Sequence, residues 1–193
     1  MQNKKYGDNA ILVDIKYIES DEYRKKFIGI TGNSDVDEIL ANKAEMILKD
    51  RSGTLKETLV LVDRDTGEEI LTIKADEENQ RIKYKPEDEK IIREAREADI
   101  DIVAIHNHPA GWPPTADDCV SAKQKDYNIG ITCGHNGTVF MYYPAEILIS
   151  EEECTEIHDI IAENCMFEKD INVILDTWKQ VLAAFDMKIK ERS

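Results

Sequence analysis

The alternation of apolar and polar positions predicts one strand and two helices in the first part of the chain. Residues 10–19 (AILVDIKYIE) predict an opening strand. Ser20-Asp21-Glu22 then predicts the start of a helix that ends at Thr31-Gly32-Asn33. Ser34 is the expected N-cap of the next helix, whose apolar stripe reaches Leu48.

The middle of the chain predicts three strands and one helix. Residues 57–63 (ETLVLVD) are apolar on both faces, which is typical of a buried strand, and a turn signal leads into a returning strand over 69–75. Pro86 and the acidic residues after it predict a helix that runs to about Ala98. Residues 101–106 (DIVAIH) predict the third of these strands.

A proline-rich loop follows that strand. The loop, residues 107–115 (NHPAGWPPT), contains three prolines and a glycine, which exclude regular structure. A helix is predicted over residues 115–125. Residues 129–133 and 138–143 then predict a hairpin across the turn Gly134-His135-Asn136-Gly137.

The last part of the chain predicts two helices, the first of them strongly acidic over residues 151–168. We expect the second to dock its apolar stripe on the protein's own core, with a partner protein as the alternative. That stripe consists of Ile171, Ile174, Leu175, Trp178, Leu182 and Phe185.

The order of these elements predicts an α/β protein, with a mixed β-sheet flanked by helices. A chain of 193 residues fits one compact domain. Residues 1–53 form a strand and helical region packed on the core, residues 54–149 form the core, and residues 150–193 add the C-terminal helices.

The charge and composition exclude several classes of protein. The formal net charge is −15, whereas nucleic-acid binders carry basic surfaces, so no direct nucleic-acid partner is expected. No run of about 18 apolar residues and no signal-peptide core occurs, so we predict a cytoplasmic protein without a membrane partner. The four cysteines form no CxxC pair and are expected to be small buried residues. A cysteine nucleophile paired with a histidine is the alternative.

One constellation predicts metal chemistry. His106 and His108 alternate at a strand end and therefore project to the same face, where both imidazoles can reach one ion. Asp118 lies in the first turn of the next helix, on the same face as Thr115. Two histidines and a carboxylate leave one open position on a tetrahedral zinc, as a catalytic site requires. Taken alone, Thr115 and Asp118 also fit a helix-capping pair, but the three features together favour a metal.

A hydrolytic zinc also needs a proton acceptor. Glu57 is the best candidate, because it begins a buried strand where a charge has no structural purpose. Glu68 and Glu69 lie at a turn and are expected to be solvated.

These residues resemble the JAMM (JAB1/MPN/Mov34) metalloprotease family, whose pattern is an early Glu, His-x-His and Ser-x-x-Asp. Here the pattern is Glu57, His106-Asn107-His108 and Thr115-Ala116-Asp117-Asp118. The HNHP tetrapeptide is most similar to the RadC-type and phage-associated bacterial branches, and the resemblance covers roughly residues 55–145. The segments YIESDEYRKKF and RSGTLKETLVLVDRDTG resemble those that precede the motif in some phage minor-head-associated proteins. The fold implied is the JAB-like, cytidine-deaminase-like sandwich.

The resemblance also implies a role for each residue. His106, His108 and Asp118 would bind Zn²⁺ with water in the fourth place, and that water would attack an amide carbonyl. Glu57 would act as general base and pass the proton to the leaving amine, while Thr115 would support the oxyanion. The substrate implied is a peptide or isopeptide bond, often at the tail of a ubiquitin-like protein.

The chain departs from the family at two points, a loop one residue shorter between His108 and Thr115, and Thr in place of Ser. Trp112, on that loop, either flanks a substrate groove or packs the loop. His135 is expected to be exposed in its turn, with an approach to the site as the alternative. His158 carries no signal, and Asp117 faces away from Asp118 on its helix.

Two other functions stay open. Some proteins with this fold have lost the metal and act as scaffolds, and a RadC-like protein would act on a nucleic-acid-linked substrate. Retention of all four acid and histidine positions favours the hydrolase, and the acidic composition argues against the nucleic-acid substrate. The oligomeric state is open, with the final helix as the candidate interface.

Overall fold

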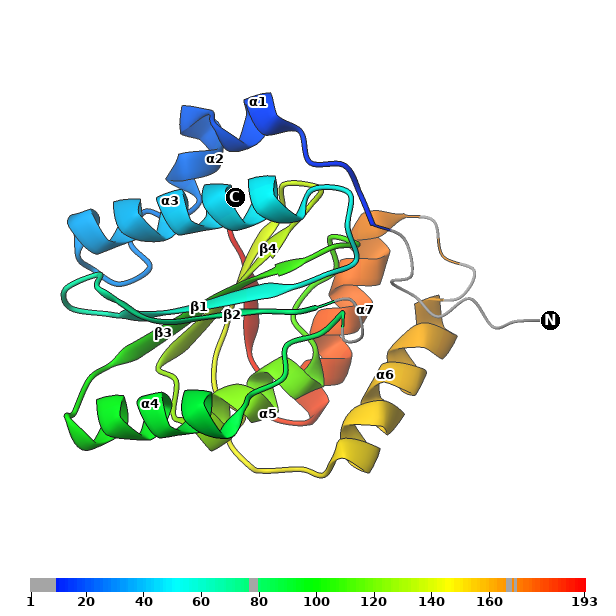
Figure 1. Cartoon of the computed structure of the whole chain (residues 1–193). Helices are drawn as coiled ribbons and strands as arrows, with labels where there is room; N and C mark the ends of the chain where they lie inside the picture. Colours follow the sequence, from blue (N-terminus) through cyan, green and yellow to red (C-terminus); the bar gives the residue numbers. More distant parts are fainter. Residues whose placement is uncertain (1–9, 77–79, 166–167, 169) are drawn as a thin grey trace.

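A mixed β-sheet forms the centre of the protein (Figure 1). The computed structural model describes residues 10–76, 80–165, 168 and 170–193, and these contain one six-stranded sheet of order β2-β1-β3-β4-β5-β6. Only the β3–β4 pair is parallel among the described strands. The strands are β1 Thr58–Asp63, β2 Glu69–Lys74, β3 Ile102–His108, β4 Ile129–Gly134, β5 Val139–Tyr142 and β6 Ile189–Glu191.

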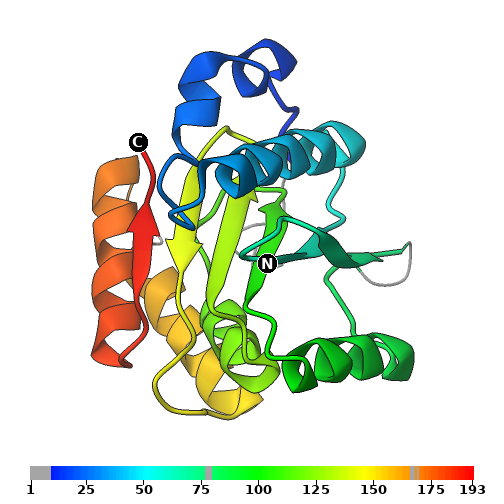
Figure 2. The ribbon, with the colours of Figure 1, turned by 90° about the vertical axis from the view of Figure 1, so that its left-hand side faces the viewer.

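Helices cover both faces of this sheet, as Figures 1 and 2 show. The helix α3 lies on one face with the short helices α1 and α2, while α4 to α7 lie on the other. The α/β class with a mixed sheet flanked by helices is therefore confirmed. The helices are α1 Ile15–Ile18, α2 Asp21–Lys25, α3 Ser34–Arg51, α4 Pro86–Glu97, α5 Ala116–Lys125, α6 Glu151–Cys165 and α7 Ile171–Ala184. Every described helix is too short or too polar to cross a bilayer.

Strand β3 supplies both hydrophobic cores because its side chains alternate between the two faces. Val103 and Ile105 pack in the α3 core, whereas Ile102 and Ala104 pack in the core under α4 to α7. His106 and His108 continue the second of these rows and Asn107 continues the first. The alternation therefore decides which polar residue at the end of the strand faces which layer.

Several predicted elements are confirmed. Both hairpins form, and helices α4 and α5 lie within a residue of their predicted bounds. The stripe of α7 docks on the protein's own core through Ile174, Trp178 and Leu182. All four cysteines are buried and free.

The N-terminal predictions need correction. Residues 10–19 contain no strand, because the Asp14 side chain accepts a hydrogen bond from the backbone N–H of Tyr17 and starts helix α1. The helix after Ser20 ends at Lys25 and continues only as turns. Asn33, one residue before the predicted Ser34, caps α3 by accepting from Asp35.

One strand is longer than the sequence pattern predicts, and another has no counterpart in the predictions. Strand β3 continues through His108, which pairs with Gly134 of β4, so the irregular loop begins only at Pro109. Strand β6 is not predicted at all, because it is three residues long and its pairing with β5 depends on long-range contacts.

Candidate metal centre

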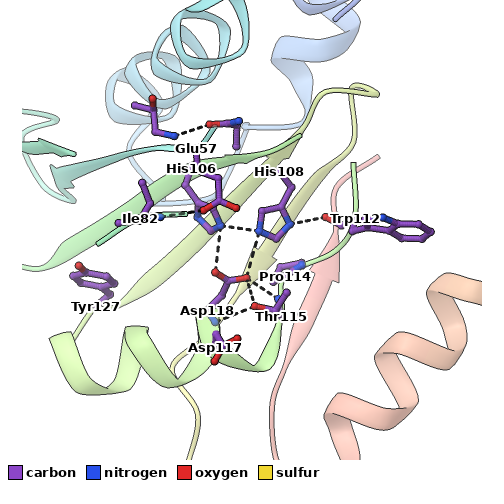
Figure 3. Close-up of polar contacts among 12 residues, drawn as sticks. Glu57, Ile82, His106, His108, Trp112, Pro114, Thr115, Asp117, Asp118 and Tyr127 are labelled. Carbon is purple, nitrogen blue, oxygen red and sulfur yellow. Dashed lines mark hydrogen bonds and ion pairs between the residues drawn. The ribbon is translucent and has the colours of Figure 1, made fainter. Parts of the chain in front are cut away.

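His106 and His108 stand side by side at the end of β3, on the face that α5 covers (Figure 3). Both are buried, with 4% and 8% of their surface exposed. Their Nε2 atoms are 3.1 Å apart. The strand therefore presents two imidazole nitrogens to one point, as the His-x-His spacing predicts.

Helix α5 brings a carboxylate to the same point. The Asp118 Oδ1 atom lies 3.3 Å from His106 Nε2, and Oδ2 lies 3.5 Å from His108 Nε2. Asp118 is the third residue of α5, and it is held there by a capping box with Thr115. The backbone N–H and the hydroxyl of Thr115 donate to Asp118 Oδ2 at 2.6 and 2.8 Å. The capping interpretation and the metal interpretation of this pair are thus compatible.

The donor geometry fits a small tetrahedral cation. His106, His108 and Asp118 each offer one ligand atom, and these atoms lie within 4.8 Å of one another. With metal–ligand bonds of about 2.0–2.1 Å, the ligand atoms of a tetrahedral site are about 3.3–3.4 Å apart. The two imidazole nitrogens, 3.1 Å apart, are close to that spacing, and each has one Asp118 oxygen at a similar distance, Oδ1 at 3.3 Å from His106 and Oδ2 at 3.5 Å from His108. Two imidazoles and one carboxylate are a donor set that Zn²⁺ accepts in catalytic sites.

The orientation of His108 is fixed by its other ring nitrogen. Its Nδ1 lies 2.9 Å from the backbone carbonyl of Trp112, which can only accept, so Nδ1 carries the proton. Neutral His108 therefore keeps a lone pair on Nε2, the atom that faces Asp118. Such an outer partner is typical of metal-binding histidines.

The charges at this point favour a cation. Burial lowers the pKa of His108, but the carboxylates of Asp118 and Glu57 outweigh it and raise that pKa to about 9. Burial likewise raises the pKa of Asp118, yet His106 and His108 hold it well below its usual range. Two carboxylates thus surround two imidazoles, and the site is stabilised by added positive charge.

Glu57 lies on the neighbouring strand, one residue before β1. Leu59 pairs with His106, so the same register puts Glu57 opposite His108 on the α5 face of the sheet. Its carboxylate accepts a hydrogen bond from the backbone N–H of Ile82 at 3.3 Å (Figure 3). Burial raises the pKa of Glu57, and the charges of His108 and His106 oppose that rise. A carboxylate with a raised pKa beside a metal site suits a proton acceptor.

Asn107 is a candidate that the sequence pattern does not predict. Its side chain points to the α3 face, where Oδ1 accepts from Thr58 N at 2.8 Å and Nδ2 donates to Lys56 O at 3.1 Å. These two groups flank Glu57 along the chain, so Asn107 fixes the backbone that carries Glu57. The available signal is the break in the apolar row after Val103 and Ile105.

His135 contacts the Asn107 amide, and the prediction that it is exposed in its turn is wrong. It is 1% exposed rather than solvated in its turn. Its Nε2 lies 3.0 Å from Asn107 Nδ2 and its Nδ1 lies 2.9 Å from the carbonyl of Ile11. The Asn107 amide and the Ile11 carbonyl define a neutral ring protonated at Nδ1. Burial lowers the pKa of His135.

The donor atoms open on a cavity of about 480 Å³. Glu57, His106, His108, Asp118 and Trp112 all line it, and α6 forms its far wall. That wall includes His158, whose Nε2 is 3.9 Å from the Asp117 carboxylate. The space beside the predicted ligands is therefore shaped in part by residues, such as His158, for which the sequence gives no functional signal.

Trp112 has a packing role in addition to its place in the cavity wall. Its ring stacks on Trp178 of α7, with ring centroids 5.8 Å apart and an angle of 8° between the planes. Trp178 in turn donates from Nε1 to the carbonyl of Pro114. The two tryptophans tie the short loop to α7, as the loop-packing alternative expects, while the substrate-groove alternative for Trp112 stays a prediction.

Comparison with protein-family models and with curated proteins gives no match for this chain. The interpretation of the site therefore depends on its own geometry.

Proposed function

We propose that this protein is a zinc-dependent hydrolase of the JAMM type, a peptidase or isopeptidase. His106, His108 and Asp118 hold the ion, and Glu57 is the general base. The observation that carries the proposal is the convergence of three donor residues, with one ligand atom from each within 4.8 Å of the others, on a cavity that Glu57 also lines. When bound, the ion would polarise a substrate carbonyl and acidify water.

The residues of the chain would divide the remaining work. Glu57 accepts a proton and returns it to the leaving amine, which its raised pKa and its position opposite His108 favour. Thr115 holds the Asp118 carboxylate in place, and the carbonyl of Trp112 holds His108. The mixed sheet flanked by helices supports the resemblance to the JAMM fold. The substrate is a protein or peptide, for which a ubiquitin-like tail is the first candidate.

Elemental analysis of the purified protein tests the metal first. We expect about one zinc per chain in the wild type, in line with a single three-ligand site, and none in a His106→Ala/His108→Ala variant. A wild type that stays free of metal after incubation with zinc would overturn the hydrolase.

A peptide and isopeptide library then tests the reaction. We expect Glu57→Gln to retain zinc and lose cleavage by about 100-fold or more, since general base catalysis contributes about 10²–10⁴-fold. Glu68→Gln, at the exposed turn after β1, is the matched control and should cleave as the wild type does.

A further inference from the structure

The resemblance assigns the oxyanion to Thr115, but its hydroxyl proton has another acceptor. The Thr115 Oγ1 atom lies 2.8 Å from Asp118 Oδ2 and donates to it. A carboxylate only accepts, so the hydroxyl proton points at Asp118. The same oxygen accepts from the backbone N–H of Asp118 at 3.3 Å. Thr115 therefore has no second proton for a substrate oxygen.

A pair of tyrosines in the same cavity offers the missing donor. Tyr84, on the segment between β2 and α4, and Tyr127, just after α5, both line the cavity. Their hydroxyl oxygens are 3.1 Å apart, and Tyr127 donates to Tyr84. Among the described residues no hydrogen bond donated by Tyr84 is found, and Tyr84 lines the cavity, so its proton is available to a group bound there. A hydroxyl that already accepts a hydrogen bond is a stronger donor.

The Tyr84 ring is held in position from outside the cavity. The ammonium of Lys125 lies 4.8 Å from the ring centroid, and Lys125 forms an ion pair with Glu89. Burial, and to a lesser degree the charge of Asp118, raises the pKa of Tyr84 to about 12. The phenol is therefore protonated at neutral pH and lies within the electrostatic reach of Asp118.

We propose that the Tyr84 hydroxyl is the hydrogen-bond donor to the substrate oxygen in this cavity, and that Tyr127 is its positioning residue. This inference rests on the proposed hydrolase function. Fixed phenol donors are among the groups that stabilise an oxyanion, since they need no reorganisation as charge develops. The donor thus comes from the segment before α4, outside the Ser/Thr-x-x-Asp motif.

Binding of acetohydroxamate to the zinc-loaded full chain, measured by calorimetry, tests the donor without a known substrate. We expect Tyr84→Phe to weaken binding about tenfold or more, since a hydrogen bond to a charged oxygen is lost, with the zinc content unchanged. Tyr127→Phe should weaken binding by less. In the Tyr84→Phe background it should have no further effect, because Tyr127 acts only through Tyr84. Tyr143→Phe, on the exposed chain after β5, is the matched control.

Three results would overturn the inference. Wild-type affinity in Tyr84→Phe would remove Tyr84 from the site while leaving the hydrolase intact. A loss seen in Tyr142→Phe alone would assign the donor to the tyrosine that packs edge-on against His106. A wild type that binds no zinc would overturn the hydrolase and the donor together.

Discussion

The two faces of β3 hold histidines in opposite electrostatic environments. On the α5 face, His108 lies beside Asp118 and Glu57, and its pKa is raised to about 9 although burial lowers it. On the α3 face, Asn107 contacts His135, whose hydrogen-bond partners are an amide and a carbonyl and whose pKa burial lowers. Both histidines are almost fully buried.

The comparison shows that the neighbours of a buried histidine, rather than its burial, decide its chemistry. Carboxylates around His108 stabilise added positive charge, so a metal ion can take the place of a proton there. The neutral groups around His135 define one tautomer and leave no lone pair for a metal. One face of the strand is thus suited to bind an ion, and the other holds the backbone that carries Glu57.

Replacing the histidine on each face by alanine, one at a time, should have the largest effect and should affect zinc binding on one face and stability on the other. We expect His108→Ala to weaken zinc binding by more than the roughly 10–100-fold that loss of an outer partner costs, because a ligand itself is removed. His135→Ala should keep one zinc per chain and lose stability instead. Zinc titration and urea unfolding of both variants distinguish the two roles. Equal loss of zinc in both would show that the α3 face also serves the metal.

The two histidines should also give opposite pH dependences of stability in the metal-free protein. The pKa of His108 is raised above 6.5, so its contribution is complete below that pH and is lost as the pH rises through about 9. The pKa of His135 is lowered, so its contribution is present above pH 6.5 and is lost as the pH falls through the lowered value. The combined contribution of the two histidines to stability should therefore be highest near pH 6.5.

Bound zinc should remove most of the loss of stability that the metal-free protein shows above pH 6.5. A metal ligand is neutral, so zinc-loaded protein has no protonated His108 to lose. We expect the metal-free chain to lose on the order of 2–3 kcal/mol between pH 6.5 and 9, and the zinc-loaded chain to lose much less. Urea unfolding across this range, with chelator or with zinc, measures both. Parallel profiles would mean that zinc does not contact His108.

The sequence predicts the α5 face of β3 far better than the α3 face. His106, His108 and Asp118 follow local rules, namely strand alternation and the first turn of a capped helix, so their convergence can be predicted from spacing. Asn107 and His135 act through residues 28 to 124 positions away in the chain, and local sequence patterns do not indicate such partners.

The cavity walls likewise include elements whose existence can be predicted from local sequence but whose position cannot. Helix α6 is predicted as a helix, but its place beside the predicted metal ligands depends on how it packs against α5 and α7. The first strand is wrongly predicted because the Asp14 cap outweighs the apolar pattern of residues 10–19.

Asn107→Leu should separate the backbone role of the α3 face from metal binding. Leucine has a similar volume but leaves Thr58 N–H and Lys56 C=O without their partner, which costs about 2–3 kcal/mol. Zinc content should stay at one per chain, because Asn107 points away from the ligands. Asn164→Leu, exposed on α6, is the control and should unfold near the wild-type urea concentration. Loss of zinc in Asn107→Leu would show that the two faces are not independent.

Thr115 gives the smallest and most specific test, because it replaces the serine of the JAMM pattern. Thr115→Ala removes the hydroxyl that caps α5 and donates to Asp118 Oδ2, so we expect about 1 kcal/mol of lost stability and up to about tenfold weaker zinc binding. Thr115→Ser keeps the hydroxyl and should restore both, measured by urea unfolding and zinc titration. If serine binds zinc no better than alanine does, the methyl group rather than the hydroxyl holds Asp118, and the departure from the family pattern would then have a function of its own.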